Sequence, residues 1–142
     1  PHYLKENIMT FIKTFEKRLD EAQFAYSLGE WISSSFATVA LADDYEKAEK
    51  QNKRNKVAWF TRQDAEYPEE LCLGFGDFDH KDDEHTAAAG HELVELVKDM
   101  PGVQGVEWDG DPNHRIVVNL DYDAAEEVGE YAVVDDWDEE EY

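Results

Sequence analysis

The densest group of side chains that could bind a metal ion lies between residues 79 and 91. Three histidines, His80, His85 and His91, are interspersed with the carboxylates Asp79, Asp82, Asp83 and Glu84. Imidazole and carboxylate groups bind zinc or non-haem iron where three or four of them converge. His91 and Glu92 begin like the H-E-x-x-H zinc motif, but Glu95 stands where the second histidine belongs. We therefore expect an acidic loop before a helix, with no metal or other cofactor.

A second acidic stretch imitates the start of a calcium-binding loop. Asp109, Asp111 and Asn113 match its first three ligand positions, but the required glycine is His114 and the final glutamate is Leu120. A hairpin turn fits this stretch better. The chain has so many carboxylates that no pair stands out as general acid and base, and the serines at 33–35 lack the glycines of a nucleophile elbow. We predict no catalytic residues and expect that the protein is not an enzyme.

The acidic residues are unevenly distributed along the chain, whose formal net charge is −22. Residues 1–56 hold nine basic and nine acidic side chains, and residues 57–120 hold four and fifteen. The segment 121–142 holds eleven acidic side chains and no Lys or Arg. Since 42% of the residues are apolar, we expect a folded protein rather than a disordered acidic chain. Charge that is concentrated in one part of the sequence favours a surface for a partner.

The acidic C-terminal segment carries our predicted partner-binding residues. They are Glu126, Glu127, Glu130, Asp135, Asp136, Trp137, Asp138, Glu139, Glu140 and Glu141. Trp137 is surrounded by carboxylates and is the best candidate for an aromatic anchor. We expect an interaction module that imitates nucleic acid, because DNA presents one charge per ~1.7 Å of its axis and carboxylates on a helix can approximate such an array. Small acidic inhibitors of restriction or CRISPR systems share this composition.

This hypothesis predicts a basic nucleic-acid-binding protein as the partner, without direct binding to nucleic acid or membrane. A first alternative is a structural or assembly subunit, for instance of a phage, that forms homo-oligomers through its N-terminal helices. A second alternative is a metal-dependent enzyme that uses His80, His85 and His91. The single cysteine, Cys72, and the absence of a signal peptide or membrane-spanning run indicate a cytoplasmic location.

The first third of the sequence has helical periodicity. Apolar residues recur at three-four spacing from Leu4 to Phe24, and a second helix is predicted from about Glu30 towards Arg54. Gly29 would separate the two, which gives a long helical hairpin over residues 1–54. The second helix ends in a Lys/Arg run that suits a helix C-terminus and could also meet the acidic half of the chain. We expect residues 1–8 to be a remnant of expression or processing.

The rest of the chain, residues 55–142, is predicted to form an acidic α+β part of the same compact domain. Strands are expected at 57–61 and 71–78, a helix at 86–99, and a hairpin with strands near 103–108 and 116–122. The result is α+β, with a mostly antiparallel sheet of about four strands, one packed helix and an acidic C-terminal segment. The order strand, helix, strand suggests a crossover unit of the split ferredoxin-like kind. Residues 123–131 could form a short helix and residues 131–134 an edge strand.

Overall fold

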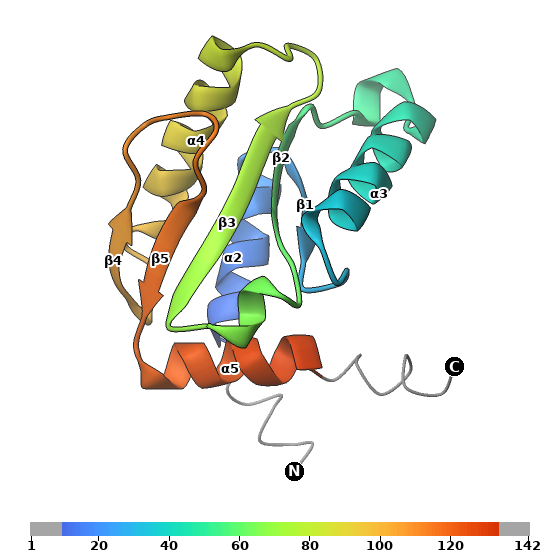
Figure 1. Cartoon of the computed structure of the whole chain (residues 1–142). Helices are drawn as coiled ribbons and strands as arrows, with labels where there is room; N and C mark the ends of the chain where they lie inside the picture. Colours follow the sequence, from blue (N-terminus) through green and yellow to red (C-terminus); the bar gives the residue numbers. More distant parts are fainter. Residues whose placement is uncertain (1–9, 134–142) are drawn as a thin grey trace.

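A five-stranded mixed sheet forms the centre of the protein in a computed structural model, which describes residues 10–133 (Figure 1). Along the chain the elements are α2 (Thr10–Glu21), β1 (Phe24–Leu28), α3 (Ser34–Lys47), β2 (Lys56–Phe60), β3 (Glu70–Asp77), α4 (Asp83–Val97), β4 (Val103–Glu107), β5 (Ile116–Leu120) and α5 (Tyr122–Val133). Two short 3-10 turns, η1 (Lys50–Asn52) and η2 (Asp64–Glu66), flank β2. The predicted α+β class is confirmed.

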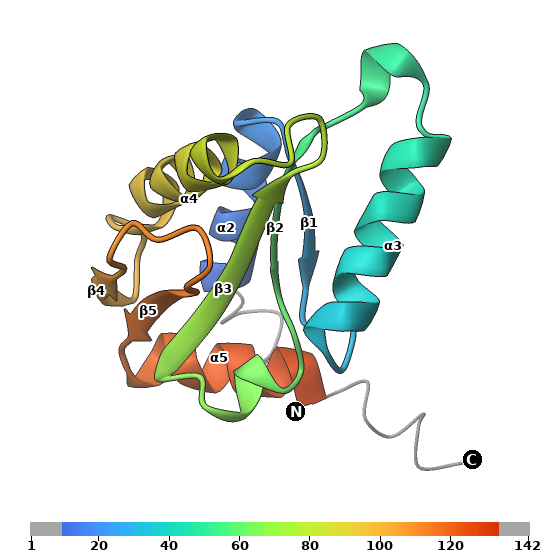
Figure 2. The same cartoon turned by 45° about the horizontal axis from the view of Figure 1, so that its top comes forward.

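The strands lie in the order β1-β2-β3-β5-β4, and β1 with β2 is the parallel pair. Helices α2 and α4 cover one face of this sheet, α3 packs against β1 and β2 on the other, and α5 lies across one end (Figures 1 and 2). The core lies mainly between the sheet and the layer of α2 and α4. It contains Leu71, Leu73 and Phe75, which alternate along β3 as predicted.

The expected helical hairpin over residues 1–54 is wrong. Residues 24–28 form β1, and α2 and α3 lie on opposite faces of the sheet. Gln23, with a φ of 65°, turns the chain out of α2 and into the strand. The buried residues Phe24 and Leu28 are four positions apart, a spacing that fits both a helix and a strand. Local periodicity therefore could not distinguish a helix from a strand here.

β1 is also the reason that the sheet has five strands and not about four. It pairs in parallel with β2, from Phe24 opposite Lys56 to Leu28 opposite Phe60. This pairing joins residues more than thirty positions apart, and the connection runs through α3, as a parallel crossover requires. One sheet therefore spans the expected boundary between residues 54 and 55.

The elements predicted for the second half of the chain are found close to their expected places. β2, β3, α4 and the β4–β5 hairpin all form. β5 lies between β3 and β4 and is antiparallel to both, so β3, α4 and β4 form a crossover unit with a strand inserted in it. The strand–helix–strand order suggested such a crossover unit with the last strand beside it as a hairpin partner, whereas in the structure that strand lies within the unit.

The acidic segment after Leu120 forms a helix up to Val133. The short helix expected at 123–131 is thus present, whereas an edge strand beginning at Tyr131 is wrong, because residues 131–133 continue α5. The helix buries Ala124, Ala125, Val128 and Ala132 against the rest of the domain. Residues 134–142 lie outside the described part.

None of the helices within residues 10–133 has both the length and the apolar character needed to cross a bilayer.

Candidate functional site

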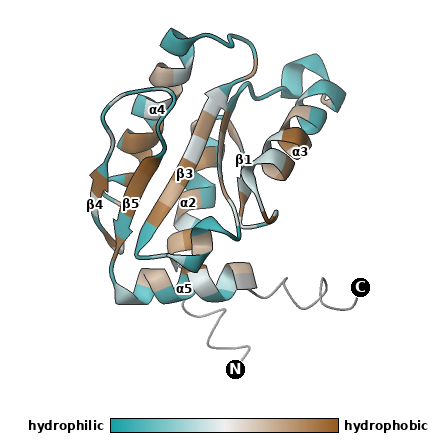
Figure 3. Ribbon diagram, viewed as in Figure 1, coloured by the Kyte–Doolittle hydropathy of each residue, from teal (hydrophilic) through white to brown (hydrophobic). Residues whose placement is uncertain are grey.

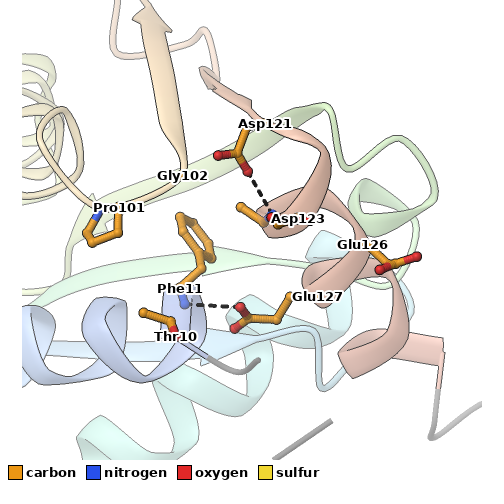
Figure 4. A pocket seen from close by; sticks show the side chains of 9 residues that line it. Thr10, Phe11, Pro101, Gly102, Asp121, Asp123, Glu126 and Glu127 are labelled. Atoms are coloured by element: carbon orange, nitrogen blue, oxygen red, sulfur yellow. Dashed lines mark hydrogen bonds between the residues drawn. The ribbon is translucent and has the colours of Figure 1, made fainter. Parts of the chain in front are cut away.

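A hollow of about 360 Å³ opens where α5 meets the beginnings of α2 and β4 (Figure 4). Four carboxylates line it together with smaller and apolar groups. Its lining residues are Thr10, Phe11, Pro101, Gly102, Asp121, Asp123, Ala124, Glu126 and Glu127. Two of these, Glu126 and Glu127, are among the predicted partner-binding residues.

Glu127 is turned into the protein and is only 3% exposed. Its carboxylate accepts hydrogen bonds from the backbone N–H of Phe11, at 3.1 Å, and of Ile12, at 2.8 Å. These donors belong to the first turn of α2, where N–H groups have no partner within the helix. Burial raises the pKa of Glu127 above its usual value, although the backbone hydrogen bonds act in the opposite direction. This carboxylate therefore holds α2 and α5 together from inside the fold.

Asp121 begins α5 and fixes its position against β4. Its Oδ1 accepts from the backbone N–H of Ala124 at 2.9 Å, as an N-cap does, and its own N–H donates to the carbonyl of Gly102 at 2.8 Å. Gly102 has a φ of +90°, and a Cβ there would lie 2.6 Å from Cβ of Ala124. Only glycine allows this close approach of the β4 turn to α5.

The outer side of α5 carries exposed carboxylates. Asp123, Glu126 and Glu130 are exposed, and Glu126 accepts a hydrogen bond from the hydroxyl of Tyr122 at 3.2 Å. Neither Asp123 nor Glu126 takes part in an ion pair with a cation of residues 10–133. The other predicted partner-binding residues, Asp135, Asp136, Trp137, Asp138, Glu139, Glu140 and Glu141, lie outside the described residues.

Basic side chains are paired with carboxylates elsewhere in the fold. Arg54 Nη1 lies 2.8 Å from Asp20 Oδ1, and Lys56 Nζ lies 2.8 Å from Glu92 Oε2. The Lys/Arg run after α3 thus contacts both the neutral N-terminal part and the acidic half of the chain. Arg18 pairs with Asp99 in the same way. None of these printed ion pairs includes Asp123 or Glu126.

The loop between β3 and α4 is held by Asp77, at the end of β3, and by Asp82, the N-cap of α4. Asp77 accepts hydrogen bonds from Asn55 Nδ2 and from the backbone N–H groups of Asp79 and His80, at 2.9–3.1 Å. Burial by itself would raise the pKa of Asp77, but these hydrogen bonds outweigh it and lower that pKa. Asp82 caps α4 through the N–H of His85 at 2.8 Å. The sequence prediction of an acidic loop before a helix describes this arrangement.

The three histidines that were considered as metal ligands lie in two places. His80 and His85 stack with ring centroids 4.2 Å apart, and His85 Nδ1 lies 2.8 Å from Asp82. The hydrogen bond to Asp82 raises the pKa of His85. His91 packs against Trp108 instead, with a centroid distance of 4.8 Å. Within residues 10–133, the three do not form a group with converging ligand atoms.

The turn between β4 and β5 does bring three possible ligands together. Ligand atoms of Asp109, Asp111 and His114 lie within 4.8 Å of one another. Sequence reasoning identified the two aspartates but treated His114 as the residue that breaks a calcium motif. In the fold, Asp109 accepts from the N–H of Asp111 at 2.9 Å and contacts His114 Nδ1 at 2.7 Å, so the side chains mainly hold the turn.

A polar cluster that sequence reasoning missed lies near the start of α3, on the other face of the sheet. Arg115 Nη2 lies 2.8 Å from Asp64 Oδ2 and donates to the carbonyl of Cys72 at 3.2 Å. Trp59 donates to the hydroxyl of Ser34 at 3.1 Å, and its ring lies directly beside Gly74. The cluster ties β2, β3 and β5 to α3. No local pattern signals it, because its members come from five separate segments.

The fold and the site define a small α+β domain with an acidic end. The chain belongs to the family described as a domain of unknown function (DUF6891), which matches residues 33–124, from α3 to the first turn of α5. Neither a curated protein nor a solved structure matches the chain. The helix α2, the strand β1 and most of α5 lie outside the family match, and with them four of the nine residues that line the hollow.

Proposed function

We propose that this protein is an acidic protein-interaction module whose α5 end binds a basic, nucleic-acid-binding partner in place of its nucleic acid. The main support for this proposal comes from the carboxylates on the outer side of α5. There Asp123 and Glu126 are exposed, border a hollow and have no ion pair within residues 10–133. The chain's single, unpaired cysteine, Cys72, supports action in a reducing compartment such as the cytoplasm.

The spacing of the carboxylates suits a phosphate-like array. Residues 123, 126 and 130 follow one another at intervals of three and four, which places neighbours about 5–6 Å apart between Cβ atoms. With a net charge of −22, the protein attracts a basic surface over long range. Such attraction weakens steeply with salt, because the Debye length is about 8 Å at physiological ionic strength.

The hollow supplies a place for one long basic side chain. Pro101 is exposed and offers apolar surface, and Asp123 and Glu126 stand with it along the lining (Figure 4). A Lys or Arg side chain has this same division between an apolar stem and a charged end. Since Glu127 and Asp121 fix α5 against α2 and β4, the acidic groups are held in position before the partner arrives.

The test compares two doubly neutralised variants of the full chain. Asp123→Asn with Glu126→Gln removes two charges at the proposed site, and Glu84→Gln with Glu21→Gln removes two exposed charges elsewhere. Each pair includes one acid from the first turn of a helix, so the loss of charge at a helix start is the same in both variants. Partners are captured from a host lysate at low salt, and the affinity of the captured protein is then measured over a salt series.

We expect the captured partner to be basic, to be released by competing duplex DNA and to bind the site variant more weakly. By analogy with phosphate contacts, each lost ion pair reduces the slope of log affinity against log salt by about 1. The control variant should behave like the wild type. A site variant that binds the same partner with unchanged affinity and salt slope would refute the proposal.

A further inference from the structure

The outward side of α3 is apolar. Phe36 is 60% exposed and Val39 is 69% exposed, and Ile32 just before the helix is 42% exposed. Their spacing of four and three residues places them in one stripe, next to Trp31, which is 41% exposed. Only Ala37 and Leu41 of α3 are buried against the sheet. The helix lies on the opposite face of the sheet from α2 and α4 (Figure 2), and its ribbon includes strongly hydrophobic residues (Figure 3).

The stripe lies in an uncharged stretch of the sequence. The twelve residues from Trp31 to Ala42 contain no Asp, Glu, Lys or Arg, although 34% of the chain is charged. The other exposed large apolar side chains within residues 10–133 are Tyr67 and Tyr122, which lie on other elements. Exposed apolar patches of this kind mark interaction surfaces.

The stripe also has a fixed shape. The carbonyl of Trp31 accepts from the N–H of Arg62 at 2.9 Å, and that of Ile32 accepts from Gln63 at 3.3 Å. These bonds attach the start of the stripe to the segment after β2. A partner would therefore meet a preformed surface and lose little entropy in ordering it.

The charges at the two ends of α3 indicate which partner fits. The first turn carries no acidic residue, and the N-cap Ser33 makes no side-chain capping bond. Asp43 and Asp44 lie in the C-terminal half instead, where the negative end of the helix dipole disfavours them. Asp43, which pairs with Lys47, continues the line of Ile32, Phe36 and Val39 at helical spacing. If the α3 helix of a second copy packed antiparallel to this one, its aspartates would lie at the N-terminus of this helix, which has no side-chain cap.

We infer that α3 is the contact surface of a homodimer, in which the α3 helices of two copies pack antiparallel about a twofold axis between Phe36 and Val39. Phe36 of each copy then lies opposite Val39 of the other, and Asp43 lies near the first turn of the opposite helix. The interface is self-complementary, as twofold symmetry requires. It is separate from the acidic end of α5 and does not depend on the function proposed for that end.

The two proposals respond to salt in opposite ways. Each copy has a net charge of −22, so two copies repel one another except through the uncharged stripe. The Debye length falls from about 30 Å in 0.01 M salt to about 3 Å in 1 M salt. Dimerisation should therefore strengthen with salt, whereas binding of a basic partner should weaken.

The test is sedimentation velocity of the full chain at these two salt concentrations over a series of protein concentrations. The wild type should sediment at twice the chain mass of 16.4 kDa at high salt. Phe36→Ser with Val39→Ser should raise the dimer dissociation constant at least about tenfold, because four apolar side chains leave the interface. Tyr67→Ser with Tyr122→Ser removes two equally exposed aromatic rings elsewhere and should leave the dimer intact. Circular dichroism confirms that each variant is folded.

Disulfide cross-linking tests the antiparallel arrangement, in a Cys72→Ser background. Val39→Cys lies near the axis and should form an intermolecular disulfide, whereas Asp43→Cys should not, because the two sites would be about 16 Å apart along the helices. A parallel pair would cross-link at both positions and would overturn the arrangement. A wild type that stays monomeric at high salt would overturn the inference itself. The stripe would then be covered by another protein or by another segment of the chain.

Discussion

The carboxylate of Glu127 accepts a hydrogen bond from the backbone N–H of Ile12 at 2.8 Å, across 115 positions of sequence. The last described helix thereby satisfies donors at the start of the first one. The same residue was expected to face a partner, and its neighbours Glu126 and Glu130 are exposed. A single turn of α5 thus carries both an internal structural carboxylate and surface charge, and this difference leads to the first two predictions.

Replacing Glu127 with alanine should destabilise the protein. The substitution removes the acceptor of two backbone N–H groups, and an unsatisfied buried donor costs about 1–3 kcal/mol. Urea denaturation of Glu127→Ala should show this loss in the free energy of unfolding. Glu126→Ala, on the exposed side of the same helix, should change that free energy by no more than about 0.5 kcal/mol. Equal effects of the two substitutions would contradict the inward position of Glu127.

The raised pKa of Glu127 should make part of the stability depend on pH. Above the usual value of 4.5, the native state retains the proton more than the unfolded state does. The stability that Glu127 contributes through this shift is therefore fully present below its pKa in the unfolded state. It is lost as pH rises through its pKa in the folded state. The free energy of unfolding of the wild type minus that of Glu127→Gln should fall across this window. A difference that stays constant or rises would show that the hydrogen bonds outweigh burial.

Asp77 should show the opposite dependence. Its pKa is lowered from 3.8, because Asn55, Asp79 and His80 donate hydrogen bonds to it and outweigh its burial. The stability that Asp77 contributes is present above its pKa in the unfolded state. It is lost as pH falls through its pKa in the folded state. Asp77→Ala should cost about 1–3 kcal/mol near pH 7 and less near pH 3. A cost that does not change with pH would argue that the side chain acts through its shape alone.

Two neighbouring glycines of β3 should differ in their tolerance of alanine. A Cβ on Gly74 would lie 2.1 Å from the ring of Trp59, whereas one on Gly76 would lie 3.5 Å from Val57. Gly74→Ala must displace the indole and break its bond to Ser34, so we expect a loss of about 1–3 kcal/mol from overpacking. Gly76→Ala should change stability by less than about 1 kcal/mol. Thermal unfolding of the pair measures this, and similar melting temperatures would contradict the close contact with Trp59.

Several elements were predictable from the sequence because their signals are local. The helix α4 combines apolar residues at helical spacing, such as Ala89, Leu93 and Val97, with acidic residues at its start. β3 alternates apolar and small residues, and β5 alternates buried with partly exposed ones. The α+β class and the crossover of β3, α4 and β4 follow from the order of these elements. The uneven distribution of charge is likewise a property of the sequence alone.

The tertiary structure decided the features that depend on contacts between distant residues. Phe24 to Leu28 became a strand because β2 offers a parallel partner, and no residue within the segment signals that pairing. The carboxylates of Glu126 and Glu127 are adjacent and chemically alike, yet one is exposed and the other is buried. Their difference arises from helical geometry, which turns neighbouring side chains by about 100°, and from the position of α2 beside α5. Sequence determined how much charge this protein carries, and packing determined which of that charge faces the solvent.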